Sequence, residues 1–240
     1  MEVLKVNFKF IKFTIVMLFI LMQIYLIFIK KHYALDIDVY PNTNPTSHVY
    51  EDNSVGQTFI AQRDNLSRID VMLGTHDRVN DKDVIFELWE MDGERKLVAK
   101  SVFNASSVKN NLYHPITFKN VKNSKDKKYY FLLYSPESTY ENSISVWMNQ
   151  KDIYRCGDYL FRNVISRGDL VFRIYSKRPI YSELGRIVRN YSGVFGSIPF
   201  LIAAIVFFIV VQILFLGKLL DLIYKSLKNP GFIEKRDGNV

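Results

Sequence analysis

Two long apolar runs, at residues 13–29 and 198–216, constrain this chain of 240 residues more than any other feature. Neither run contains a charged side chain. At a helical rise of about 1.5 Å per residue, a helix of this length covers most or all of a hydrocarbon core roughly 30 Å thick. The sequence therefore predicts a transmembrane helix at residues 13–29 and another at residues 198–216, with a polar segment between them.

Basic residues gather at the ends of both runs, and their distribution predicts an orientation. The ends of the chain carry Lys5, Lys9, Lys12, Lys218, Lys225, Lys228, Lys235 and Arg236. The opposing set is Lys30, Lys31, Lys177, Arg178, Arg186 and Arg189. Long loops cross a membrane largely regardless of charge, so we expect residues 1–12 and 217–240 to be cytoplasmic. The protein is then a two-pass protein of the cell (inner) membrane with an extracytoplasmic main domain.

The same basic residues account for the net charge of +8, so nucleic acid is not an expected partner. The first run also fits the hydrophobic region of a signal peptide. It is long for that role, and the following KKHYALDIDVY has no small-x-small cleavage pattern. We therefore expect an uncleaved anchor.

Between the runs, apolar residues alternate with polar ones. Four segments place three apolar side chains each on one face, namely Ile69, Val71 and Leu73; Val84, Phe86 and Leu88; Ile144, Val146 and Met148; and Leu170, Phe172 and Ile174. A period of two is typical of half-buried strands. Residues 55–62, 96–103, 113–120 and 129–135 are further strand candidates, and Asp92-Gly93 indicates a hairpin turn. The pattern predicts one antiparallel β-sandwich over residues 34–178.

Two amphipathic stretches flank the second run. Residues 180–196 form a juxtamembrane segment with apolar side chains at helical spacing, and residues 217–240 include a similar stretch up to Asn229-Pro230-Gly231. Both stretches fit helices in the headgroup layer. A simple extension of the transmembrane helix, or packing onto the sandwich, fits the same pattern.

A succession of segments between residues 55 and 176 resembles a known kind of domain. These segments are GQTFIAQRDNLSRIDVMLGT, FELWE, PITF, KKYYFLLYSPES, NSISVWM and GDLVFRIY. In them the chain resembles the extracytoplasmic jelly-roll domains of bacterial membrane proteins from surface-polysaccharide and glycosyl-transfer systems. The resemblance implies an all-β antiparallel jelly-roll sandwich, flanked here by two transmembrane α-helices, and a relation to carbohydrate-binding sandwiches. Multi-span glycosyltransferases differ from this chain, which has only two apolar runs.

Aromatic residues on the polar faces of strands suggest a sugar-binding surface. Trp89 and Trp147 alternate with the inward residues of their strands, and a sugar ring stacks its C–H surface on such an indole. We include Tyr134, Tyr140, Asn149 and Tyr154 in this predicted carbohydrate site. The alternative is that these side chains cover the sandwich or pack under a loop, because tryptophan is usually largely buried.

The loop THDRVNDKD offers oxygen ligands of the kind that calcium prefers, from Asp77, Asn80, Asp81 and Asp83. A solvated polar loop is the preferred explanation of these residues, and no other cofactor is expected. The four histidines, His32, His48, His76 and His114, lack zinc-ligand spacing. Cys156, the one cysteine, is expected to be a small buried apolar side chain.

No catalytic motif is present, which favours a non-enzyme. We expect a membrane-anchored, non-catalytic accessory protein whose exported sandwich binds glycan or supports surface-polysaccharide assembly. The alternative is a structural subunit that binds a multi-span transporter or glycosyltransferase through protein contacts. An enzyme acting on lipid-linked sugar would need converging carboxylates, which a linear sequence does not display.

Overall fold

The computed structural model describes residues 8–41, 43–183 and 197–228. The chain divides into two compact units. One unit, residues 32–178, is built of strands, and the other combines residues 1–31 with residues 179–240 and contains both apolar runs.

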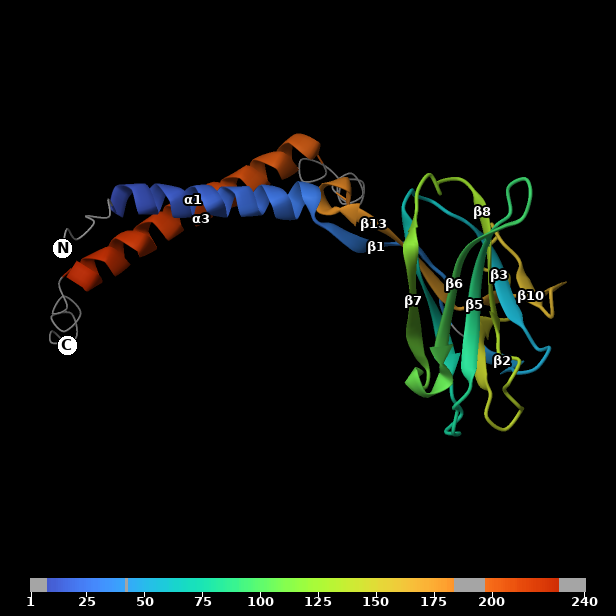
Figure 1. Ribbon diagram of the computed structural model, residues 1–240. Helices are drawn as coiled ribbons and strands as arrows, with labels where there is room; N and C mark the ends of the chain where they lie inside the picture. Colours follow the sequence, from blue (N-terminus) through green and yellow to red (C-terminus); the bar gives the residue numbers. More distant parts are fainter. Residues whose placement is uncertain (1–7, 42, 184–196, 229–240) are drawn as a thin grey trace. The chain divides into compact units, whose positions relative to one another are not determined.

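Two antiparallel sheets make up the strand unit (Figure 1). The six-stranded sheet has the order β11 (Val164–Ser166), β10 (Tyr159–Phe161), β3 (Val55–Ile60), β8 (Lys128–Tyr134), β5 (Asp83–Glu90) and β6 (Lys96–Asn104). The seven-stranded sheet has the order β1 (Lys31–Asp38), β13 (Phe172–Pro179), β4 (Leu66–Gly74), β9 (Ile144–Asn149) and β12 (Asp169–Leu170). In addition, β2 (Asn44–Val49) pairs with β9 and β7 (Leu112–Val121) pairs with β4. The predicted antiparallel β-sandwich is confirmed.

The core lies between the two sheets and follows the predicted alternation. Of the twelve side chains expected to face inward, eleven are at most 1 % exposed, and Met148 packs against the core as a partly buried residue. Four phenylalanines form the centre, and their ring centroids lie 5.5 to 6.3 Å apart in the contacting pairs; they are Phe59, Phe86, Phe131 and Phe172. The period of two thus decides which face of each strand is buried.

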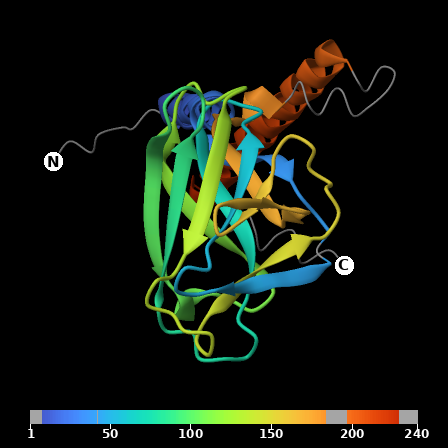
Figure 2. The ribbon, with the colours of Figure 1, turned by 90° about the vertical axis from the view of Figure 1, so that its right-hand side faces the viewer.

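The turn between β5 and β6 is also confirmed at Asp92-Gly93, where Gly93 has a φ of +78°. Four strands were not predicted, namely β1, β2, β10 and β11, and the segment predicted around Leu170, Phe172 and Ile174 forms two strands, β12 and β13. β2 contains Asn, Pro, Thr and Ser, while β10, β11 and β12 are only two or three residues long. Such strands carry no readable periodicity, and their pairing with longer neighbours defines them. Figure 2 shows the blue β2 beside the yellow β9.

A buried polar group joins the two sheets. Gln57 on β3 and Asp169 on β12 are both 0 % exposed, and the Gln57 amide donates to the Asp169 carboxylate at 3.0 Å. That carboxylate also accepts the backbone N–H groups of Ile153 and Tyr154, at 2.7 and 2.8 Å. In return, the Gln57 carbonyl oxygen accepts the N–H of Leu170. The burial of Asp169 raises the pKa of its carboxyl group, against the opposing effect of these donors.

The other unit contains two helices long and apolar enough to cross a membrane, as predicted. The first is α1 (Phe8–Ile24), which continues as a π-helical turn, η1 (Tyr25–Ile29), and the second is α3 (Ile198–Lys228). With 31 residues, α3 is ~46 Å long, so it extends beyond a hydrocarbon core of roughly 30 Å. Residues 217–228 therefore continue the helix of the second run.

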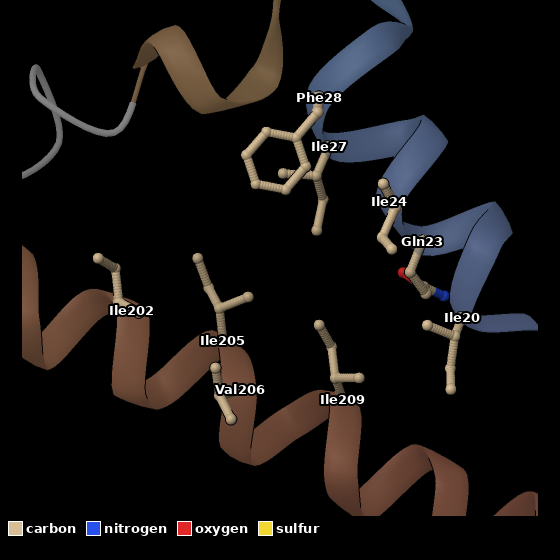
Figure 3. Close-up of a pocket in the computed structure, with 9 residues that line it drawn as sticks. All are labelled: Ile20, Gln23, Ile24, Ile27, Phe28, Ile202, Ile205, Val206 and Ile209. Atoms are coloured by element: carbon tan, nitrogen blue, oxygen red, sulfur yellow. The ribbon is translucent and has the colours of Figure 1, made fainter.

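Polar and aromatic contacts join α1 to α3 near the first residues of α1. Lys12 forms an ion pair with Asp221 at 2.7 Å, and the rings of Phe8 and Tyr224 stack with centroids 3.9 Å apart. Gly217 lies under the Lys12 stem, where a Cβ would be 3.6 Å from it. Towards the other end of α1, an apolar cavity of about 210 Å³ separates the helices, with Gln23 as its one polar lining residue (Figure 3).

Two short helices complete the described chain, η2 (Ala105–Ser107) and η3 (Ile180–Glu183). The rest of the predicted juxtamembrane segment, residues 184–196, lies outside the described residues, as do residues 229–240 of the tail. The prediction for Cys156 is wrong, because its side chain is exposed. It lies in the loop between β9 and β10, where no sheet covers it.

Candidate functional site

The six residues of the predicted carbohydrate site do not form one site. Trp89 and Tyr134 lie on the six-stranded sheet, whereas Trp147 and Asn149 lie on the seven-stranded sheet. Both tryptophans alternate with the inward residues, as predicted, so they face outward on different sheets. The linear pattern gives the face of each strand but not the sheet to which the strand belongs.

On the six-stranded sheet, Trp89 and Tyr134 converge on Glu87. The carboxylate accepts hydrogen bonds from the Trp89 indole at 3.2 Å, the Tyr134 hydroxyl at 2.8 Å and Lys100 at 3.0 Å. Burial raises the pKa of Glu87, but the bonds from Lys100 and Tyr134 outweigh it and hold the pKa below its ordinary value. Arg95 stacks over the Trp89 ring at 4.4 Å. The polar groups of this cluster satisfy one another across β5, β6 and β8.

Asn149 and Tyr154 support the backbone. The buried Asn149 amide donates to the Pro41 carbonyl at 2.7 Å, and its oxygen accepts the N–H of Lys151. The Tyr154 hydroxyl accepts the N–H of Ile60, and its ring packs edge-on against Phe172. These contacts explain both residues without a ligand.

The four oxygen-bearing residues of the predicted calcium loop are engaged by hydrogen bonds within the protein. Asn80 is buried and donates to the carbonyls of Asn142 and Ser143. Asp81 and Asp83 accept hydrogen bonds from Asn142 and Asn104, and Asp77 accepts one from Asn110 at 3.5 Å. Within the described parts of the chain, no three His, Cys, Asp or Glu side chains gather around a metal position. The loop is therefore held by asparagine contacts.

A different group of polar side chains comes together where β2, β4 and β9 meet. His48 lies opposite Ser145 in the β2–β9 register, and Gly74, the last residue of β4, pairs with Ser145 from the other side. His76, two residues beyond β4, contacts the Ser145 hydroxyl at 2.7 Å through Nε2. The rings of His48 and His76 pack edge to face at 5.1 Å. Sheet pairing thus gathers three residues that are distant in sequence.

Arg78 connects this group to Tyr140. Its guanidinium donates to the Tyr140 carbonyl and to His48 Nδ1, the latter at 2.9 Å, and lies over the Tyr140 ring at 5.4 Å. His48 also packs edge-on against Tyr140 at 4.6 Å. The Tyr140 side chain is 55 % exposed, so its ring remains available to a ligand.

Beside these residues lies a hollow of about 290 Å³, which we call the end hollow. It is lined by His48, Tyr50, Asn53, Tyr140, Phe161 and Arg162. A second hollow of about 280 Å³ is lined by Arg78 together with Thr75, Val79, Asn80, Ala105, Ser106 and Val108. Three aromatic rings and several hydrogen-bonding groups thus line the end hollow. This combination is typical of ligand sites.

A tight turn positions Arg162 in the end hollow. β10 and β11 are joined by Arg162 and Asn163, whose φ values of +49° and +60° suit a two-residue turn in which both central residues are left-handed. The Arg162 Nε donates to the buried Asn53 at 2.6 Å, and its backbone N–H donates to Ser54. His76 also has a positive φ, of +55°.

Both histidines of the site are held in the neutral state. Burial lowers the pKa of His48, and the charges of Arg78 and His76 lower it further. Burial also lowers the pKa of His76, with a further contribution from Arg78. Near neutral pH each imidazole therefore offers one N–H donor and one acceptor nitrogen.

His76 and Ser145 have the spacing of a base and a nucleophile. Ser145 is 0 % exposed, however, and it lies within β9 rather than at a sharp turn. A substrate carbonyl has no path to that oxygen. The contact therefore serves to orient His76.

Of the group around His48 and Arg78, only Tyr140 was predicted from the sequence as a site residue. Trp147, also predicted, lies on β9 near this group. Trp147 lies on the same outward face as Ser145, and its indole donates to Asn111 at 2.9 Å. His48 and Arg78 are 30 positions apart, and His76 and Ser145 are 69 apart. No spacing rule connects such residues. The one local signal was the polar loop after β4, interpreted as a calcium loop.

The fold and the site define a class, an antiparallel β-sandwich attached to two apolar helices, with an aromatic and arginine-lined hollow at one end. No family model matches the chain, and no curated protein matches it either.

Proposed function

We propose that this protein is a two-pass protein of the inner membrane that presents a glycan-binding β-sandwich outside the cytoplasm. The observation that carries the proposal is the end hollow, where Tyr50, Tyr140 and Phe161 meet His48, Asn53 and Arg162. Aromatic rings stack on the C–H faces of sugars, and neighbouring polar groups bind sugar hydroxyls. We also propose that the sandwich is a jelly roll related to carbohydrate-binding domains.

The action proposed is tethering without catalysis. Two apolar helices adjoin the sandwich in sequence, one directly before β1 and one shortly after β13. A binding face tied to the membrane at both ends meets a membrane-made polymer at a high local concentration, so weak contacts are sufficient. The protein would therefore act as an accessory to surface-polysaccharide assembly.

A direct test measures saccharide binding to the full chain in lipid nanodiscs on a glycan array. Tyr140→Ala removes an exposed ring without removing the backbone carbonyl that Arg78 uses, so the loop keeps its anchor. We expect this variant to lose at least ten-fold in affinity. Trp89→Ala, on the other sheet, is the matched control and should bind as the parent does. Equal binding by Tyr140→Ala, or no binding by a folded parent, would refute the proposal.

A structural subunit that binds a multi-span transporter or glycosyltransferase is the second candidate. Exposed aliphatic side chains on the two edge strands of the six-stranded sheet favour it, namely Leu97, Val102, Val164 and Ile165. Edge strands with such side chains are suited to protein contacts. A stable membrane partner that is captured equally by the parent and by Tyr140→Ala, but lost with Val102→Lys, would support this candidate.

A further inference from the structure

Arg78 and Arg162 differ from three other arginines of the sandwich, which form ion pairs. Arg68, Arg173 and Arg178 each pair with an aspartate, at 2.6, 2.9 and 2.8 Å. Within the described chain, neither Arg78 nor Arg162 lies within 4 Å of a carboxylate oxygen. Their hydrogen bonds go to neutral acceptors instead, the Tyr140 carbonyl, the His48 ring and the Asn53 amide. Each guanidinium is thus held by neutral acceptors rather than by a direct ion pair, while the pKa of Glu141, lowered by a hydrogen bond from Thr139, is lowered further by the charge of Arg78.

The walls of both hollows lack acidic side chains. Neither wall contains an Asp or Glu among the described residues. Acidic residues do adjoin several lining residues in sequence, among them Glu51 and Asp52 between Tyr50 and Asn53, Asp77 beside Arg78, and Glu141 beside Tyr140, and these four are exposed. Asp77 is engaged by Asn110, and a hydrogen bond from Thr139 lowers the pKa of Glu141. The walls of the hollows therefore contain guanidinium groups and no carboxylate among the described residues.

Arg162 keeps its best donors available. Its Nε is used by Asn53, while its two terminal nitrogens make no hydrogen bond within the described residues. A guanidinium held by one nitrogen presents a fixed fork, and such a fork suits the paired oxygens of a carboxylate or a phosphate. The Arg78 guanidinium lies 2.9 Å from Nδ1 and 3.3 Å from Nε2 of His48, so the neutral ring that accepts through Nδ1 has its hydrogen on Nε2.

We propose that the saccharide bound in the end hollow is anionic and carries a carboxylate or a phosphate group that Arg162 and Arg78 bind. This inference rests on the proposed glycan-binding function and names the class of glycan. Arg162 binds the anionic group through its terminal nitrogens, and Arg78 adds a second positive charge. Tyr140 and Phe161 contact the sugar ring. A hollow of about 290 Å³ suits one or two sugar units of a longer polymer.

The experiment uses the full chain in nanodiscs made of a zwitterionic lipid, with two pairs of probes. Oligogalacturonate is compared with its methyl ester, which has the same rings without the charge, and phosphomannan is compared with mannan. Affinity is measured by calorimetry at low and high salt. Arg162→Gln and Arg78→Gln are the test variants. Arg95→Gln is the matched control, because Arg95 stacks on Trp89 over the other sheet.

We expect at least one acidic probe to bind ten-fold or more tightly than its neutral partner, with an affinity that falls as salt rises. Arg162→Gln should weaken binding of the acidic probe at least ten-fold. Arg95→Gln should bind this probe as the parent does. Preference for carboxylate or for phosphate identifies the group. Equal binding of acidic and neutral probes overturns the anionic assignment and leaves glycan binding intact. Failure of all four probes with a folded chain overturns both.

Discussion

Replacing Asp169 with alanine tests whether the buried polar group between the sheets holds the sandwich together. The change removes the acceptor for Gln57 and for the N–H groups of Ile153 and Tyr154. A buried donor left without its partner costs about 1–3 kcal/mol. Gln57 is fully buried, whereas the loop carrying Ile153 is partly open to water. We therefore expect a loss of about 3–5 kcal/mol in the free energy of unfolding.

The measurement is chemical denaturation of the full chain in detergent, followed by tryptophan fluorescence and circular dichroism. Asp64→Ala is the matched control, since Asp64 also accepts a backbone N–H, from Lys125 at 3.0 Å, but is exposed. The control should lose no more than about 0.5 kcal/mol. A loss for Asp169→Ala within 1 kcal/mol of the control would show that the group contributes little and that the reasoning is wrong.

Two further predictions concern the packing and the pH dependence of the sandwich. Gly157→Ala places a Cβ 1.9 Å from the Thr58 carbonyl oxygen, so we expect the free energy of unfolding, measured by thermal denaturation, to fall by at least about 2 kcal/mol. Gly93 has open space around it, so Gly93→Ala should cost only about 1 kcal/mol, through its positive φ. The pKa values of His48 and His76 are lowered below 6.5 in the folded chain. The folded state therefore binds fewer protons than the unfolded state, and the free energy of unfolding should fall as the pH drops below about 6.5. A His48→Gln/His76→Gln variant should show a shallower fall, with His114 still contributing in the same sense; an unchanged pH profile of unfolding would contradict this.

Much of the architecture follows from local pattern. The alternation around Ile69, Phe86, Val146 and Phe172 predicted both the strands and their buried faces, because burial on one face requires a period of two. The apolar runs predicted the helices in the same direct way. Short strands such as β10 escaped prediction, since three residues hold no period and their pairing with β3 defines them.

The site was less predictable, for a physical reason. His48, Arg78 and Tyr140 belong to segments that only the pairing of β2, β9 and β4 brings together, and register is a property of the whole sheet. The two tryptophans stand out in the sequence because they lie on the polar faces of their strands. In the structure, each indole donates a hydrogen bond to a neighbouring polar side chain. Local chemistry marked individual residues, and tertiary pairing decided which of them meet.

The most direct test of the account uses Cys156, the one cysteine of the chain, whose side chain is exposed on the sandwich. Intact cells are treated with a membrane-impermeant maleimide, and Ser226→Cys in a Cys156→Ser background reports the opposite side of the membrane. The account predicts labelling of Cys156 in intact cells and labelling of the Ser226→Cys variant only after permeabilisation. Labelling of Cys156 only after permeabilisation would place the sandwich in the cytoplasm and contradict a role in binding surface glycans.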